Sequence, residues 1–386
     1  MGELALGREL ECFIKAESTA GTLVEPDSTD CVFAINTPTI TQDRETFDDA
    51  QKRNTRSRLT AIAGRYLSGT WGFDTYIRPS GTVGVPPMED KLVKGLLGTR
   101  TDSTSTGCTY TLLGTTTDLQ SYSMWFKEGH TVMFCTGATV NQGVFKVDGR
   151  NPGTVTWSGG FMKRLWTGTA TTSAVMTDTT STTVAVTSPY GDLYNIGSVI
   201  KINSEVMKVT SVATNTLTVQ RGYKTTSAAN HTSGATIEPW WPTAYEGLWG
   251  GPIHGRLGIV TWDAVNFNTM TNEVTITNNI KYYEEEKNNE DFCQSYGTPE
   301  SRTLEARVTA YFRKEQAKKL KDAWDFDSAA IVIPCGSTAG SKCTVNLPLN
   351  RLKAPAITGD AERIIEMTAL PYASVAYNDE VNIVYA

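Results

Sequence analysis

The chain has 386 residues, of which 39% are hydrophobic and 20% charged, and a formal net charge of −6. These values exclude a disordered chain and a coiled coil, and an acidic protein lacks the basic surface that a duplex-wrapping protein needs. Threonine is in excess at 57 residues, and 33 glycines and 15 prolines interrupt the chain. Because β-branched residues favour strands, this composition predicts a β-rich protein with many turns.

The first hundred residues are predicted to alternate between strands and turns. Strands are expected over 9–15 and 31–35. From 70 to 77 apolar and polar residues alternate strictly, which is typical of a half-buried strand. Apolar residues then recur every four positions between 88 and 97, and Gly98 follows as a stop signal, so this segment is predicted to be a short amphipathic helix.

A long charged segment runs from Asp43 to Arg58. It has no helical apolar stripe, so we expect a long exposed hairpin loop, or arm. The arm is acidic first and basic second, so arms of neighbouring molecules could pair acid against base; a solvated loop without a partner is the alternative. The candidate contact residues are Asp43, Arg44, Glu45, Asp48, Asp49, Lys52, Arg53, Arg56 and Arg58.

The composition changes near Gly168, where a tract rich in threonine, serine and alanine begins. Short strands with tight turns follow, and Pro239-Trp240-Trp241-Pro242 ends the pattern. We therefore expect a small all-β module over 168–238, inserted into a discontinuous host domain of residues 1–166 and 240–386. The strands predicted in the module are 182–186, 199–202, 205–209, 216–219 and 235–237.

The host domain resumes after the module. Alternation over 272–281 and 302–312 predicts strands with one apolar and one polar face. The polar face of the second strand carries Glu305 and Arg307; such a strand cannot lie inside a sandwich, but it can line an aqueous channel. A second amphipathic helix is predicted over 312–324, and three more strands end the chain.

The sequence shows no pattern typical of an active site or a metal centre. His130, His231 and His254 have no ligand spacing, and the first two are expected at the surface. No phosphate-binding or nucleophile motif occurs, so neither an enzyme nor a cofactor is expected. The acidic group Glu284, Glu285 and Glu286 lacks the spacing of a calcium loop, and we interpret it as a solvated loop or an acidic rim facing a polyanion.

The sequence predicts neither export nor a membrane span. No run approaches 18 apolar residues, and the N-terminal segment lacks the regions of a signal peptide, so folding in a cytoplasm is expected. The seven cysteines form no C-x-x-C pair and are expected as thiols. Cys335 and Cys343 flank a Gly-rich turn and are the one pair that could bridge a hairpin.

The C-terminal half has a recognisable order of features. The strand region 266–281 and an acidic loop precede the strand 302–312, a helix and the closing segment 378–385. This order resembles that of the tail tube (major tail) proteins of long-tailed bacteriophages. The inserted module resembles a small β (Ig-like) module of phage structural proteins, through 196–202, 205–209, 216–223, His231 and Gly234.

The resemblance implies a mainly β fold: a β-sandwich or partial barrel of the tail-tube type with one or two short helices, from which the inserted all-β module projects outward. Each subunit would give four strands to a barrel shared by a ring, usually of six subunits, and the rings would stack. The result would be a smooth, negatively charged channel for genome ejection, of the non-contractile siphophage type. Candidate lumen residues are Glu305, Glu284, Glu285 and Glu286.

The same resemblance implies the partners and the location of the protein. The partners would be other copies of the chain, the tape measure protein, the tail tip and tail terminator proteins, and viral DNA that passes through the lumen without tight binding. No membrane, metal or cofactor is implied. The chain would be a late structural protein of the virion tail, assembled in the host cytoplasm, and not an enzyme.

A carbohydrate-binding or adhesin-like β protein of a virion or cell surface is the alternative. The richness in threonine and aromatic pairs such as Trp240-Trp241 fit it, although packing in a core or interface is the simpler reading of those pairs. The lack of a signal peptide and the strand pattern of a wide pore do not fit it.

Overall fold

The computed structural model describes residues 10–49, 61–113, 119–243, 249–287, 289–314, 317–353, 355–359 and 361–386. Strands account for 51% of the protein and helices for 7%, which confirms the prediction of a mainly β fold. The chain divides into two compact units. The first comprises Met1–Cys31, Tyr122–Gly137 and Lys163–Ala244, and the second comprises Val32–Ser121, Ala138–Met162 and Tyr245–Ala386.

The first unit contains a four-stranded sheet with an aromatic core. Phe13 lies opposite Trp125 on the neighbouring strand, and the Trp125 ring meets the Phe134 ring edge to face with centroids 4.4 Å apart. All three rings are buried, so aromatic packing stabilises this sheet. Its strands are β1 (Glu11–Ala16), β9 (Tyr122–Glu128), the first part of β10 (Thr131–Asp148) and β12 (Lys163–Thr167).

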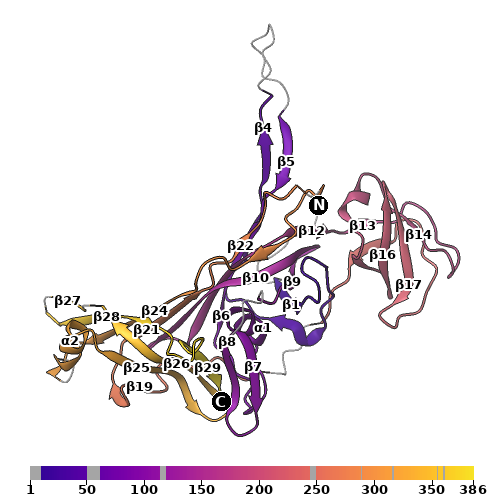
Figure 1. Ribbon diagram of the computed structural model, residues 1–386. Coiled ribbons are helices and arrows are strands. Elements are labelled where there is room, and N and C mark those ends of the chain that lie inside the picture. The colour runs from indigo at the N-terminus through magenta and orange to yellow at the C-terminus, as the bar shows by residue number, and fades with distance from the viewer. Residues whose placement is uncertain are drawn as a thin grey trace. The chain divides into compact units, whose positions relative to one another are not determined.

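A separate six-stranded sheet of the same unit is built from residues 170–239 (Figure 1). It has its own apolar core, which includes Val184, Ile200, Met207, Leu217 and Ile237. The five strands predicted between 182 and 237 all occur. In spatial order the strands are β13 (Ala170–Thr171), β18 (Thr236–Pro239), β15 (Val199–Ile202), β16 (Glu205–Ala213), β17 (Thr216–Tyr223) and β14 (Thr183–Ala185).

An ionic network is buried at one end of this sheet. Arg221 Nε and Nη2 donate to the two carboxylate oxygens of Glu205 at 2.7 and 2.9 Å, and His231 Nε2 lies 2.8 Å from Glu205 Oε2. Glu205 is fully buried and His231 is 2% exposed. The prediction of a surface position for His231 is therefore wrong, because a charged partner from a distant strand removes it from water.

The second unit is dominated by one large antiparallel sheet. Seven strands follow one another across it, and each register runs between neighbours in this order. They are β3 (Thr39–Thr41), β6 (Gly69–Tyr76), β11 (Thr154–Phe161), the second part of β10, β21 (Thr271–Thr277), β24 (Thr303–Tyr311) and β28 (Ile364–Pro371).

Beyond β28 the sheet curls over to form a half-barrel. The long strand β26 (Ser341–Leu352) makes the corner, because its last residues pair with β28 and its first residues pair with β29 (Asn382–Tyr385). The remaining strands of the curled part are β25 (Ser328–Thr338), β19 (Val260–Trp262), β20 (Val265–Phe267), β27 (Ala356–Thr358), β8 (Gly107–Leu112) and β7 (Gly98–Ser103).

Short elements complete the two units. The hairpin strands β4 (Arg44–Phe47) and β5 (Ile62–Tyr66) pair with each other, as do β22 (Lys281–Tyr282) and β23 (Tyr296–Gly297). The strand β2 (Cys31–Val32) and two 3-10 turns, Ser28–Asp30 and Tyr190–Leu193, are the smallest elements.

Two α-helices are described. The helix α1 (Asp90–Leu97) lies within the predicted segment, and Leu92 and Leu96 are fully buried. The helix α2 (Ala317–Trp324) is shorter than predicted, because the spacing from Phe312 onward only mimics the helical period: Phe312 N–H donates to the carbonyl of Arg363 instead.

Cys335 and Cys343 lie opposite each other in the β25–β26 hairpin, as their positions around the turn suggested. Both are thiols in this structure, as are the other five cysteines. Burial raises the pKa of the Cys335 thiol to about 12. The thiols of this hairpin therefore remain protonated at neutral pH and are poor nucleophiles.

Gly143 on β10 gives α1 room to pack on the sheet. A Cβ atom there would lie 2.6 Å from Leu96 Cδ2 and 3.2 Å from the Trp157 ring. We expect Gly143→Ala to lower the free energy of unfolding by about 1–3 kcal/mol, the usual cost of overpacking a core. Gly149→Ala is the matched control, since its Cβ would meet only the carbonyl of Met270 at 3.9 Å. Urea unfolding of both variants measures the difference; equal stability would contradict the packing.

Glu89, which precedes α1, is a fully buried carboxyl group. It accepts hydrogen bonds from Tyr385 Oη at 2.7 Å and from the Arg78 N–H at 3.0 Å. Burial raises its pKa to about 7, although these two hydrogen bonds oppose the shift. Glu89 is thus a proton-binding site that the unfolded chain, with an ordinary glutamate pKa near ~4.3, lacks.

This shift predicts a stability that falls as pH rises. The extra proton affinity of folded Glu89 stabilises the protein fully below about pH 4.3, and this contribution is lost as pH rises through about 7. Glu89→Gln removes the ionisation, so the variant should lose stability less than the wild type between about pH 5 and 8. The exposed Glu128→Gln is the control. Urea titrations at several pH values test this; parallel curves for wild type and Glu89→Gln would refute it.

Candidate functional site: the polar face of the large sheet

The large sheet of the second unit has one apolar and one polar face. Along β24, for example, Ala306, Val308 and Ala310 are fully buried, whereas Glu305 and Arg307 between them reach solvent. The same alternation continues on the neighbouring strands. A sheet of this kind is packed on one side and hydrated on the other.

The polar face consists mainly of threonine and a few charged residues. Registers place Lys146, Glu273 and Arg307 in one row across β10, β21 and β24. The threonines of the face are Thr70, Thr154, Thr156, Thr271, Thr275, Thr277, Thr303, Thr309 and Thr368. Its charged residues are five acids, Asp74, Asp148, Glu273, Glu305 and Glu366, and two bases, Lys146 and Arg307. The face is therefore mildly acidic.

Glu305, a predicted lumen residue, lies on this face. Its carboxylate accepts a hydrogen bond from Arg307 Nε at 2.7 Å, and Lys353 Nζ lies 3.4 Å from its second oxygen. The hydrogen bond from Arg307 lowers the pKa of Glu305, so the group stays ionised at neutral pH. Because both neighbours are cations, the negative charge of Glu305 is partly compensated.

The other predicted lumen residues, Glu284, Glu285 and Glu286, lie elsewhere, in the loop after β22. Arg65 of β5 holds this loop: its Nη1 donates to the carbonyl oxygens of Glu284 and Glu286, each at 2.6 Å. The structure therefore does not bring these acids together with Glu305 on the strands of the polar face. It places them at the base of the β4–β5 hairpin.

The predicted arm forms the β4–β5 hairpin. Figure 1 shows the two strands as a ribbon that stands clear of the large sheet. Phe47 and Ile62 are opposite each other in it and are 54% and 57% exposed. Of the predicted contact residues, Asp43, Arg44, Glu45, Asp48 and Asp49 are described; Lys52, Arg53, Arg56 and Arg58 lie outside the described residues. A two-stranded hairpin with exposed apolar side chains is marginally stable in water, so a partner surface would stabilise it.

The large sheet begins and ends on strands with a single partner in the described registers. β3 pairs with β6, and β27 pairs with β28. All three residues of β27 are exposed. Strands of this kind present unpaired backbone groups to which another chain can add.

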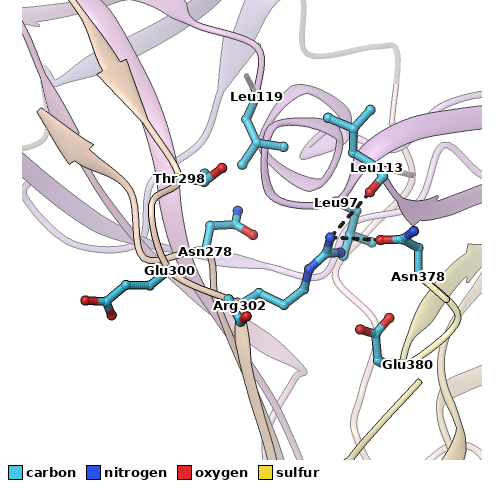
Figure 2. Close-up of a pocket in the computed structure, with 10 residues that line it drawn as sticks. Leu97, Leu113, Leu119, Asn278, Thr298, Glu300, Arg302, Asn378 and Glu380 are labelled. Atoms are coloured by element: carbon cyan, nitrogen blue, oxygen red, sulfur yellow. Dashed lines mark hydrogen bonds between the residues drawn. The ribbon is translucent and has the colours of Figure 1, made fainter. Parts of the chain in front are cut away.

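A pocket of about 320 Å³ lies at the start of β24 (Figure 2). In it Arg302 Nη2 donates to the carbonyl of Leu113 at 3.3 Å and to Asn378 Oδ1 at 3.2 Å. Burial lowers the pKa of Arg302, and the Glu380 carboxylate opposes this shift. No nucleophile in the described lining is hydrogen-bonded to a base, so we interpret the pocket as a structural contact that ties the turn before β29 to β24.

Two further searches bear on the chemistry of the described residues. They contain no group of three or more histidine, cysteine, aspartate or glutamate side chains placed to hold a metal ion. Among the helices of the same residues, none has the length and apolarity needed to span a membrane.

Comparison of the chain with protein-family models and with curated proteins gave no match in either case. The argument for function therefore depends on the residues and their arrangement.

Proposed function

We propose that the chain is a structural subunit of a phage tail tube, which polymerises as stacked rings, hexameric by the resemblance, and forms a channel for the genome. The observation that carries this proposal is the curled sheet with a threonine-rich, mildly acidic polar face and single-partner strands at its ends. Such a sheet is suited to closure by copies of itself, with the polar face inside.

The polar face has the chemistry that a sliding channel needs. A duplex carries one negative charge per ~1.7 Å of axis, and a basic bore would hold it. Threonine hydroxyls and an excess of carboxylates offer a hydrated wall without such anchors. DNA would pass without tight binding, and the tape measure protein would occupy the channel earlier in assembly.

Closure would follow from the two single-partner strands. β3 of one copy would pair directly or through bordering segments with the β27 side of the next, and a ring built from many strands leaves an aqueous pore. Ring closure would also remove the exposed strand edges that favour aggregation. The β4–β5 hairpin would link stacked rings, the module 168–238 would project outward, and tip and terminator proteins would cap the tube.

Negative-stain electron microscopy of the purified chain tests this proposal. We expect rings or hollow tubes. Solitary globules at high protein concentration would overturn it, and solitary globules that bind glycans would favour the adhesin-like alternative.

A further inference from the structure

A second pocket, of about 520 Å³, lies in the first unit, where the six-stranded sheet meets the turn between β9 and β10. Its size is in the range of roughly 300–1,000 Å³ that small-molecule sites occupy. Its main lining residues are Lys127, Thr169, Lys201, Glu238, Trp240 and Thr243. The pocket is independent of the polar face in the second unit.

The two adjacent tryptophans at this pocket have different roles. Trp241 is held in place: its Nε1 donates to Glu11 Oε2 at 2.6 Å, and its ring meets the Phe13 ring edge to face with centroids 5.0 Å apart. Trp240 is half-buried, and its backbone N–H donates to the carbonyl of Val199. The Lys224 ammonium lies 4.8 Å from the centre of the Trp240 ring. A fixed backbone and a partly exposed indole make Trp240 a platform for a ligand.

Polar groups of both kinds surround this platform. Lys201 and Glu238 are exposed and lie opposite each other on β15 and β18, and neither forms a side-chain hydrogen bond or ion pair within the described residues. Thr243 also has an uncommitted hydroxyl group there, whereas Thr169 Oγ1 donates to the carbonyl of His130. The pocket thus offers an ammonium donor, a carboxylate acceptor and a hydroxyl group that can act as either.

This combination selects among ligand classes. An anion would be repelled by Glu238 and a cation by Lys201, and Lys127 already pairs with Glu11 at 3.3 Å. A purely apolar ligand would leave these polar groups unsatisfied, which is costly. A sugar ring fits the set, because its hydroxyl groups donate and accept and its C–H face can stack on an indole.

We propose that this pocket binds a neutral saccharide, with Trp240 as the stacking platform and Lys201 and Glu238 as hydroxyl partners. The site goes beyond the tube function and does not depend on it, since a tail protein can carry a glycan-binding surface and a monomer could use the same pocket.

Saturation-transfer NMR on the full chain tests the site, with methyl glycosides of glucose, galactose, mannose and N-acetylglucosamine as probes. We expect a saturable signal from at least one probe and a loss of affinity of about tenfold or more in Trp240→Ala. Trp324→Ala, at an 84% exposed tryptophan of α2, is the matched control and should bind as the wild type does.

The double variant Lys201→Ala/Glu238→Ala guards against a folding defect in Trp240→Ala, because both residues are exposed. It should weaken binding while leaving the circular dichroism spectrum unchanged. No signal from any probe with the wild type would overturn the site, and so would equal binding by the wild type and both pocket variants.

Discussion

Replacing Phe47 and Ile62 with aspartate should abolish polymerisation while leaving the subunit folded. These side chains face each other across the β4–β5 hairpin and are more than half exposed. Burying two such side chains against another copy contributes roughly 3–6 kcal/mol, equivalent to a hundredfold or greater change in the association constant. Two carboxylates would reverse this contribution, because their burial is costly.

The measurement is the sedimented fraction of the double variant, together with negative-stain images. Val375→Asp is the matched control: it introduces the same charge at a 97% exposed position outside the hairpin, and it should polymerise normally. A wild-type circular dichroism spectrum would establish that the double variant is folded. Tubes of normal yield and length from that variant would rule out the hairpin as the link between rings.

Glu205→Gln should strongly destabilise the six-stranded sheet of the first unit. The Arg221 side chain is only 7% exposed and depends on Glu205 for its counter-charge. Glu205 also accepts backbone hydrogen bonds from Gly222 at 3.0 Å and Ala229 at 2.9 Å. Breaking one side of a buried ion pair typically costs about 3–5 kcal/mol, because the remaining charge stays buried.

The matched control is Glu305→Gln, which breaks the ion pair with Arg307 at the surface. Arg307 is 56% exposed at the side chain, and exposed pairs contribute about 0–1 kcal/mol. Amide hydrogen exchange of residues 199–223 reports the stability of the sheet directly. Similar protection in Glu205→Gln and Glu305→Gln would show that the network is not a stabilising element.

The same network predicts acid sensitivity. Burial alone would raise the pKa of Glu205, but the hydrogen bonds from Arg221, from the Ala229 N–H and from His231 lower it to about 2. The network therefore contributes its full stability above the unfolded-state pKa near ~4.3, and this contribution is lost as pH falls towards 2. Hydrogen exchange of residues 199–223 should accelerate over that interval in the wild type, and far less in Glu205→Gln.

The compensation of Glu305 by two cations qualifies the picture of an acidic channel. The polar face as a whole has more acids than bases, yet the acid singled out from the sequence is the one whose charge is most neutralised. Under the tube proposal, Glu273 and Glu366 are better candidates for repelling DNA. The alternation of the sequence predicted the face, but ion pairing between strands decides which charges remain effective.

Periodicity alone determined much of this protein. The two-residue alternation of 70–77 and 302–312 is local, because side chains of a strand point to opposite faces, and it correctly predicted half-buried strands. The excess of threonine, the turn residues and the strands between 182 and 237 are likewise local signals. The apolar spacing around Leu92 and Leu96 located α1 for the same reason.

The tertiary structure decided what depends on contacts between distant residues. His231 looked like a surface residue because no neighbour in the sequence reveals Glu205, 26 positions away, as its buried partner. Glu284 to Glu286 looked like companions of Glu305, but Arg65, more than 200 positions earlier, holds their loop beside the hairpin. Burial, charge compensation and open strand edges arise only when strands from separate parts of the chain pair, and no local pattern encodes that pairing.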